Sequence, residues 1–345
     1  MAYRTAVVGG SGYTGGELLR LVAGHPALEA TVTTASSNVG QAVADLHPGL
    51  RGAYPDTVFE AADPASLAGL DVVFLALPHG ASQEIVPSLM GTVGHIVDLG
   101  ADYRTPAADY AQWYGSPHGT PELLDDFSYG LPELFRDEVA AGTHVAVPGC
   151  YPTAAALALA PLVEAATVES ERIVVDAASG VSGRGRGLSA PSLYSEAADS
   201  MSAYGLVGHR HTGEMEYALG RVAGGDVTVL FTPHLAPMPR GILATCYAQP
   251  SGALPTTGEL LALFRSFYAG ERFVQVVDEP PSTKATLLSN AVHITARADA
   301  RTDTILVVAA EDNLVKGAAG QALQCANLLL GLEEATGLSA LGAAP

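Results

Sequence analysis

A single cysteine at a predicted helix start is the side chain in this sequence best suited to nucleophilic chemistry. Cys150 follows the strand-like segment 145–147 and the breaker Pro148-Gly149, and Pro152 suits the first turn of the helix after it. At a helix start the free backbone N–H groups and the helix dipole stabilise a thiolate, which is the nucleophilic form of cysteine. The competing interpretation is a small buried hydrophobic residue without chemistry.

Two histidines in the segment 208–213 could act with this thiol. A cysteine nucleophile needs a base that takes and returns protons, and histidine is the side chain whose ordinary pKa lies near neutrality. Either His209 or His211 could serve, and the residue types alone do not choose between them. The competing interpretation is a charged loop that is merely solvated.

A glycine-rich turn after the first predicted strand indicates a dinucleotide site. Segment 5–8 is strand-like, and the helical pattern after the turn begins near residue 13. The glycines are spaced G-x-x-G-x-x-G rather than the commoner G-x-G-x-x-G, but both spacings allow a tight turn that points a helix N-terminus at the pyrophosphate. The residues expected to bind the cofactor here are Gly9, Ser11, Gly12, Tyr13, Thr14 and Gly15.

The end of the next predicted strand, 28–34, favours NADP(H) as the cofactor. NAD-selective sites usually carry an Asp or Glu at this point to hold the ribose hydroxyls, whereas Ser36 and its neighbours are small and hydroxylated. We therefore expect Ser36 to contact the adenosine ribose. No arginine lies in this segment, so the preference for NADP(H) should be moderate unless a basic group arrives from elsewhere in the fold.

The combination of a dinucleotide turn, a helix-start cysteine and a later histidine indicates a dehydrogenase that acts on an aldehyde. In such chemistry the thiolate forms a thiohemiacetal, hydride moves to or from nicotinamide, and a thioacyl-enzyme is released to phosphate, water or another acceptor. Each signal alone is weak, and the combination is much more specific than its parts.

The order of the predicted strands and helices around these residues indicates the α/β fold class and two domains. Five predicted strands alternate with helical segments, at 5–8, 28–34, 71–77, 95–99 and 145–147. This alternation predicts an N-terminal Rossmann-like, doubly wound parallel sheet. Several later strand candidates are separated by loops too short for a helix, which predicts an α+β second domain with a mostly antiparallel sheet.

The predicted domain boundaries follow from this pattern. We expect an NADP-binding Rossmann domain over residues 1–148, completed by a C-terminal helix within about 312–345. Residues 149–311 are expected to form the catalytic, substrate and oligomerisation domain. The stretch 114–141 is predicted to be irregular, because prolines and glycines interrupt it.

Loops at the carboxyl ends of parallel strands usually form the ligand site, and several polar residues fall on them. His79 follows Leu77-Pro78, and Arg104 follows the strand at 95–99; a loop histidine bound to backbone and a surface ion pair are their ordinary alternatives. The glycine- and arginine-rich loop from Ser179 suits a phosphate or a carboxylate, with a solvated linker as its alternative.

Composition limits the partners of the chain. The 345 residues carry 17 basic and 36 acidic side chains, and a net charge of −19 disfavours nucleic acid and anionic membranes as partners. Three widely spaced cysteines argue against a disulfide framework and against a zinc site, so we expect no metal and a cytoplasmic location. No apolar run is long enough for a membrane helix. Cys246 and Cys325 are expected in the core.

At the level of whole motifs, the sequence resembles the N-acetyl-gamma-glutamyl-phosphate reductase family of the aspartate-semialdehyde dehydrogenase-like superfamily over nearly its full length. The matching motifs are GGSGYTGGEL from Gly9, LALPHG from Leu75, YGLPE from Tyr129, VPGCYPT from Val147, GHRH from Gly208 and DNLVKG from Asp312. Gly10 and Gly213 depart from the usual alanine and proline, but neither departure removes a reacting group.

This resemblance implies a reaction, a pathway and a set of site residues. It implies NADPH-dependent reduction of an N-acetylglutamyl acyl phosphate to its semialdehyde in arginine biosynthesis, with release of inorganic phosphate, by a homotetramer or homodimer. It assigns the nucleophile to Cys150 and the acid/base to His209. Further cofactor contacts are then expected at Leu77, Pro78, Ser179, Gly180 and Asn313, and substrate contacts at Arg104, His79, Arg184 and His211.

Two alternatives remain open at this point. A related reductase for aspartyl or aminoadipyl phosphate would keep Cys150 and His209 and change only the substrate contacts. A non-catalytic NADP sensor would have no reason to keep Cys150, His209 and Arg104 together.

Overall fold

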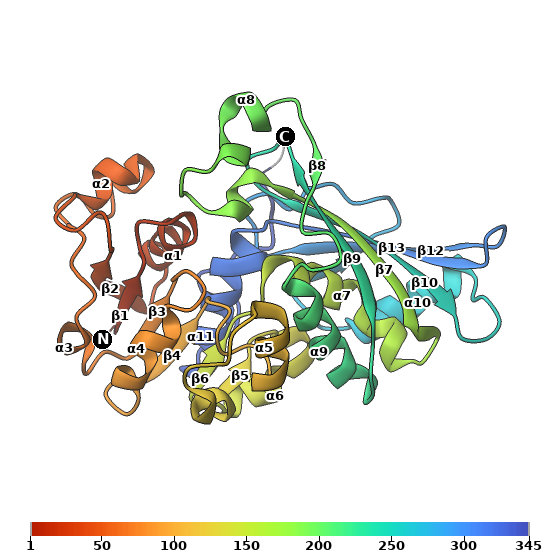
Figure 1. The fold of residues 1–345 in the computed structure, drawn as a ribbon, viewed down its shortest axis with the longest axis horizontal. Helices are drawn as coiled ribbons and strands as arrows, with labels where there is room; N and C mark the ends of the chain where they lie inside the picture. Colours follow the sequence, from red (N-terminus) through yellow and green to blue (C-terminus); the bar gives the residue numbers. More distant parts are fainter. Residues whose placement is uncertain (1, 344–345) are drawn as a thin grey trace. The chain divides into compact units, whose positions relative to one another are not determined.

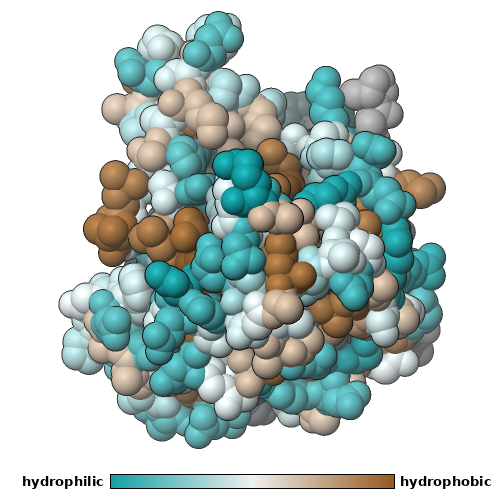
Figure 2. All heavy atoms as spheres, turned by 90° about the vertical axis from the view of Figure 1, so that its right-hand side faces the viewer, coloured by the Kyte–Doolittle hydropathy of each residue, from teal (hydrophilic) through white to brown (hydrophobic). Residues whose placement is uncertain are grey.

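The computed structural model describes residues 2–343, which form two compact units. The first unit comprises the described residues up to 148 together with 318–338, and the second comprises 149–317 with the described residues from Ser339 onward. Within the described residues no helix is both long and apolar enough to span a membrane. On the face that Figure 2 presents, hydrophilic side chains predominate and hydrophobic ones gather in local clusters.

The first unit is built on a six-stranded sheet in the order β2-β1-β3-β4-β6-β5, in which every pair is parallel (Figure 1). Its strands are β1 (Tyr3–Val8), β2 (Leu28–Thr34), β3 (Val72–Leu75), β4 (His95–Asp98), β5 (Phe127–Tyr129) and β6 (His144–Ala146). All four residues of β3 are buried, as expected of a central strand covered on both faces. The predicted Rossmann-like sheet is confirmed.

Helices connect these strands. They are α1 (Tyr13–Ala23), α2 (Val43–Leu46), α3 (Pro64–Leu67), α4 (Ser82–Leu89), α5 (Ala107–Tyr114), α6 (Pro132–Ala141) and α11 (Gly320–Leu329), with short 3₁₀ turns at Pro48–Leu50 and Pro121–Asp126. The prediction of an irregular stretch over 114–141 is wrong, because it contains β5 and α6. Pro132 occupies the first turn of α6, where a missing N–H costs nothing, so the proline begins a helix here.

The C-terminal helix α11 belongs to the core of the first unit. Leu323 and Cys325 of α11 pack in one buried cluster with Val7 and Leu18. The returning segment is 318–338, which is shorter than the expected 312–345. A π-helical turn at Val315–Ala319 precedes α11.

Residues just before the returning segment are held by the second unit. The Asp312 carboxylate pairs with Arg240 at 3.0 Å and accepts the Leu288 N–H at 2.7 Å. After the returning segment, the Ser339 carbonyl accepts the Asn290 N–H at 2.7 Å. These bonds explain why 312–317 and the residues from Ser339 group with the second unit.

The second unit contains a seven-stranded mixed sheet in the order β11-β12-β13-β10-β7-β9-β8. Its strands are β7 (Val168–Gly180), β8 (Ser202–Ala203), β9 (Val229–Ala236), β10 (Ile242–Pro250), β11 (Val274–Val276), β12 (Val292–Asp299) and β13 (Thr304–Glu311). Only the β11–β12 and β7–β9 pairs are parallel, so the prediction of a mostly antiparallel sheet is confirmed.

Helices of the second unit cover one face of this sheet (Figure 1). They are α7 (Cys150–Glu164), α9 (His211–Ala223) and α10 (Thr257–Phe267), while the short α8 (Tyr194–Ala197) lies in the connection between β7 and α9. Thirteen of the fifteen residues of α7, Tyr151 to Val163, are buried, so this helix forms the centre of the unit. Cys246 is buried in β10 and Cys325 in α11, as expected.

Candidate active site

Cys150 is the first residue of α7, as the sequence predicts. Gly149 is the N-cap; its lack of a side chain leaves the helix end without a side-chain cap, and no acidic residue lies in the first turn. The thiol is partly exposed, in contrast to the two buried cysteines. An uncapped N-terminus with an accessible thiol is the environment that favours a thiolate.

Glu214 ties the start of α7 to the histidine-bearing helix. Its buried carboxylate accepts the Gly149 N–H at 2.8 Å, and it lies in the first turn of α9, three residues after His211. A hydrogen bond to a buried carboxylate is strong, and α7 and α9 pack closely along their length. Glu214 therefore fixes the position of Cys150 relative to the histidines without itself being a reacting group.

Removing this tether should slow catalysis without abolishing substrate binding. We expect Glu214→Ala to lower kcat by about 10- to 100-fold with little change in KM, because a misplacement of about 1 Å is that costly. Glu214→Gln keeps an acceptor oxygen and should recover most of the loss. Steady-state kinetics of both variants check this expectation.

Glu216 provides the matched control. It lies on the same helix and its carboxylate likewise accepts a backbone N–H, but that of Val229 at the start of β9, at 3.0 Å. Glu216→Ala should leave kcat within about twofold, as is usual for a substitution outside the reacting geometry. Equal losses in the Glu214 and Glu216 variants would contradict the positioning role.

His209 and His211 lie together beside the cysteine helix. Their ring centroids are 4.8 Å apart, and those of His209 and Tyr151 are 5.9 Å apart. The His211 N–H donates to His209 Nδ1 at 3.2 Å, which places the proton of the neutral His209 ring on Nε2. Burial, and secondarily the Arg210 charge, lower the pKa of His209 to about 4, so the ring is neutral at neutral pH.

A pocket of about 520 Å³ in the second unit gathers these groups. It is lined by Cys150, Tyr151, Ser179, Gly183, Arg184, Gly187, Leu188, Ser189, Tyr204, His209, Arg210, His211 and Leu235. Thiol, imidazole and two guanidinium groups share this one hollow, which suits a nucleophilic attack on an anionic substrate.

Two tyrosines form the polar wall of this pocket. The Tyr204 hydroxyl donates to that of Tyr151 at 3.1 Å, and Tyr151 donates to the His234 carbonyl at 3.1 Å. Burial raises the pKa of both phenols, so they stay protonated donors. The Arg184 guanidinium lies over the Tyr204 ring, 5.6 Å from its centroid, which holds a positive charge beside the pocket.

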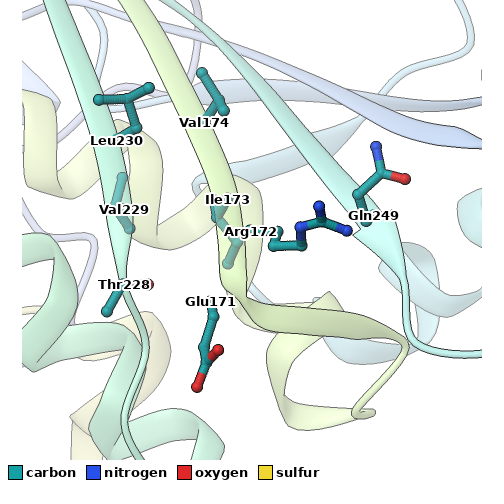
Figure 3. A pocket seen from close by; sticks show the side chains of 8 residues that line it. All are labelled: Glu171, Arg172, Ile173, Val174, Thr228, Val229, Leu230 and Gln249. Carbon is teal, nitrogen blue, oxygen red and sulfur yellow. The ribbon is translucent and has the colours of Figure 1, made fainter.

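A second, larger hollow lies on the open face of the sheet and contains none of these groups. Figure 3 shows its lining from β7, β9 and β10 and from Thr228 just before β9, with Arg172 extending toward Gln249. Its volume is about 740 Å³. Size alone therefore does not identify the site of chemistry.

The glycine turn of the first unit fits a dinucleotide. Gly9 has φ +85°, and a Cβ on it would collide with the Ala76 carbonyl oxygen, while a Cβ on Gly15 would collide with Gly9. At Gly12, the N-cap of α1, the nearest atom to an added Cβ is 3.6 Å away, and no side chain caps the helix. The turn is thus as tight as predicted, and the end of α1 stays open to an anion.

The remaining cofactor positions are distributed over both units. Ser36 is exposed two residues after the end of β2, and Leu77-Pro78 follow β3. Ser179 lies in the catalytic pocket, whereas Gly180 packs against the Arg240 backbone. The Asn313 amide already binds the Gly241 N–H at 2.7 Å and the Ser182 hydroxyl at 3.1 Å, which is a structural use of that side chain. Their contacts with a cofactor remain predictions.

His79 and Arg104 belong to a polar cluster of the first unit. His79 Nδ1 lies 3.2 Å from Asp102, and its ring packs on Tyr114 with centroids 4.3 Å apart. Arg104 is buried and donates to the Leu99 carbonyl at 2.7 Å. Complete burial raises the pKa of the neighbouring Asp98 to about 7. Roles in substrate binding for His79 and Arg104 remain predictions.

Sequence reasoning missed four residues of this site. Tyr151 directly follows the cysteine and Arg210 separates the two histidines, so adjacency could have indicated both. Tyr204 lies five residues before His209 and Glu214 five residues after it. Nothing in the sequence indicates that Tyr204 bonds to Tyr151 or that Glu214 bonds to Gly149.

Comparison with known families agrees with this geometry. Residues 4–142 match the family described as semialdehyde dehydrogenase, NAD binding domain, and residues 150–313 match semialdehyde dehydrogenase, dimerisation domain. The fold resembles that of aspartate semialdehyde dehydrogenase II from Vibrio cholerae, complexed with ASA, at a TM-score of 0.73 and 15% identity, covering 96% of this chain and 99% of that one. The fold of the NADP-containing enzyme from Candida albicans gives a TM-score of 0.69 at 18% identity, covering 96% and 99%.

The fold and the site thus define a nicotinamide-dependent oxidoreductase of the semialdehyde dehydrogenase class. Relatives that are similar in sequence show to which family within this class the chain belongs. The chain is 49% identical to the N-acetyl-gamma-glutamyl-phosphate reductase of Symbiobacterium thermophilum, covering 98% of both, and 46% identical to that of Pseudomonas fluorescens (strain Pf0-1), covering 99% of both. The chain belongs to the N-acetyl-gamma-glutamyl-phosphate reductase family.

Proposed function

We propose that the chain reduces N-acetyl-gamma-glutamyl phosphate to N-acetylglutamate semialdehyde with NADPH, a step of arginine biosynthesis. The observation that carries this proposal is the single pocket that joins Cys150, at the uncapped start of α7, with His209 and the arginines Arg184 and Arg210. The names of the near-half-identical relatives supply the substrate. Both anionic groups of that substrate, phosphate and carboxylate, suit guanidinium partners.

The chemistry begins with proton transfer from the Cys150 thiol to His209. The neutral His209 ring can accept this proton, and the opposite charges of the thiolate and the imidazolium then stabilise each other. The thiolate attacks the acyl carbon, so a C–S bond forms, the bond from carbon to the phosphate oxygen breaks, and phosphate leaves with the electron pair and takes a proton from solvent.

The resulting thioacyl-enzyme is then reduced. Bound nicotinamide supplies a hydride to the thioester carbon. His209 donates to the oxygen as negative charge develops on it, and regains the proton when the C–S bond breaks. The semialdehyde leaves, and Cys150 returns to its thiolate, ready for another acyl phosphate.

The assay for this function runs the reaction in reverse. N-acetylglutamate semialdehyde, phosphate and NADP⁺ should give rising absorbance of NADPH, with aspartate semialdehyde as the competing substrate. A higher kcat/KM for aspartate semialdehyde would assign the chain to the related aspartyl phosphate chemistry. The absence of turnover with every semialdehyde would support a non-catalytic NADP sensor.

Ser36 should decide the cofactor preference. An Asp at this strand end would repel the 2′-phosphate and still accept from a free ribose hydroxyl. We expect Ser36→Asp to reduce kcat/KM with NADPH by about 10-fold or more relative to NADH, since each 1.4 kcal/mol is a factor of ten. Measuring kcat/KM for both cofactors in both proteins checks the expectation.

Ser88→Asp is the matched control for added charge, because Ser88 is exposed on α4 of the same unit. It should leave the ratio of the two cofactors unchanged. An unchanged ratio in the Ser36 variant as well would mean that the adenosine ribose binds elsewhere.

We also propose that the working enzyme is a cytoplasmic homodimer or homotetramer. The face of the seven-stranded sheet opposite α7 exposes apolar side chains: Leu230, in the lining of the hollow of Figure 3, is 53% exposed and Tyr247 is 38% exposed. An exposed apolar sheet face of this kind suits an isologous contact between copies, and the family description of residues 150–313 as a dimerisation domain supports it.

A further inference from the structure

Gly317 packs directly against Cys150, the nucleophile of the proposed reaction. A Cβ added to Gly317 would lie 2.7 Å from Cys150 Cβ and 3.2 Å from Cys150 Cα. Both distances are shorter than the separation of about 3.5–4.0 Å at which carbon atoms pack. Gly317 does not have a positive φ, so the backbone conformation does not demand glycine here. The close approach of Cys150 is therefore what requires glycine at this position.

A buried side chain closes the other side of Gly317. Glu311, the last residue of β13, is fully buried, and its Oε1 would lie 2.9 Å from the same added Cβ. A side chain enclosed in this way has no solvent to move into, so it moves only if its neighbours move as well. Cys150, in contrast, is partly exposed and lines the pocket of about 520 Å³. Crowding at Gly317 would therefore displace Cys150 rather than Glu311.

The backbone of Gly317 is held in place by Asp312. The Gly317 N–H donates to the Asp312 carbonyl at 3.0 Å. The Asp312 carboxylate is fully buried, pairs with Arg240 at 3.0 Å and accepts the Leu288 N–H at 2.7 Å. Residues 312–317, which we call the backing turn, are thus fastened to two other segments of the second unit. A turn held at several points cannot yield easily to pressure from Cys150.

We propose that Gly317 is a positioning residue for Cys150: the backing turn supports the start of α7 from behind, so that the thiol keeps the position from which it attacks the acyl carbon. The inference deepens the proposed function and rests on it. Gly317 does not line the pocket, so it acts through Cys150 and not on the substrate. It lies within the π-helical turn Val315–Ala319, and such turns are frequent at functional sites.

The variant Gly317→Ala adds a methyl group for which the packing has no room. We expect kcat to fall by about 100-fold, because a misplacement of about 1 Å is that costly, while KM stays within about threefold, because the substrate contacts remain. Iodoacetamide should still label Cys150 at a rate within about threefold of wild type, since a small free reagent needs no fixed position of the thiol. Steady-state kinetics and peptide mapping measure this split between turnover and labelling.

Shortening Glu311 should relieve the crowding. Glu311→Asp removes one methylene group on the far side of the added methyl, so the methyl can move away from Cys150. We expect the double variant Gly317→Ala/Glu311→Asp to have a kcat at least about tenfold higher than that of Gly317→Ala alone, because residues in contact are coupled.

Two other glycines provide the controls. Gly258 lies in α10 of the same unit, where the nearest atom to an added Cβ, outside the helix backbone, is 3.9 Å away, so Gly258→Ala should match wild type. Gly94 is as crowded as Gly317, since its Cβ would lie 2.5 Å from the Asp71 carbonyl oxygen, but it precedes β4 in the first unit. Gly94→Ala should lower thermal stability and leave kcat within about twofold of wild type.

Three results would overturn the positioning role. They are a wild-type kcat in Gly317→Ala, a double variant no more active than Gly317→Ala, and labelling of the buried Cys246 and Cys325 in Gly317→Ala, which would show that the glycine is needed for folding instead. Wild-type protein that turns over no N-acetylglutamyl substrate would contradict the proposed function. The comparison of Gly317→Ala with wild type would then use the semialdehyde that the wild type does oxidise.

Discussion

Replacement of Cys150 by serine should reduce turnover by about four orders of magnitude or more, because a serine hydroxyl at this position has no thiolate form to attack the acyl phosphate. Cys150 lies in the first turn of α7, which contains no acidic residue of its own, so the positive end of the helix dipole favours the thiolate. NADPH should still bind, because the glycine turn belongs to the first unit. Steady-state rates and NADPH fluorescence titration measure the two effects.

Iodoacetamide labelling provides the control for this variant. In wild type it should modify Cys150 well ahead of Cys246 and Cys325, both of which are fully buried. Saturating acyl phosphate should protect Cys150 from the reagent. A serine variant that retains a near wild-type rate would contradict the covalent mechanism.

Replacement of His209 by asparagine should lower kcat by roughly two to four orders of magnitude, the usual worth of a positioned acid/base. The variant should also need a higher pH for labelling of Cys150, since the thiol loses the group that takes its proton. Because the pKa of His209 is lowered to about 4, the neutral ring persists as pH falls below 6. In the pH profile of kcat/KM, the fall on the acid side should therefore occur well below pH 6.5, the ordinary pKa of histidine being about 6.5.

His211→Asn is the comparison that decides between the two histidines. Both rings line the pocket, but it is the His211 backbone N–H that holds His209 in place, and asparagine keeps this N–H. The His211 variant should therefore lose much less activity. A larger loss in His211→Asn than in His209→Asn would transfer the acid/base role to His211.

The parts of the site that depend on local order along the chain could be predicted from the sequence. A helix starts at Cys150 because Pro148-Gly149 breaks the strand before it, and the turn at Gly9 is tight because only glycine fits against Ala76. Both features are short-range, so residue types within a few positions determine them.

Contacts between segments distant in sequence could not be predicted in this way. Glu214 reaches Gly149 across 65 residues, and Tyr204 meets Tyr151 across 53, because α9 and β8 are placed by the sheet of the second unit. The three-residue strand β5 was missed for a related reason: it is too short for any periodicity and depends on pairing with β6.

The most direct test of the central claim, an N-acetylglutamyl thioester on Cys150, is a rapid-mixing measurement of NADPH formation without phosphate. With N-acetylglutamate semialdehyde and NADP⁺ alone, the account predicts a burst of about one NADPH per subunit that then stops, because the acyl-enzyme has no acceptor, followed by full turnover once phosphate is added. Cys150→Ser should show no burst. Steady NADPH formation at the same rate with and without phosphate, or a burst that survives in the Cys150 variant, would contradict the account.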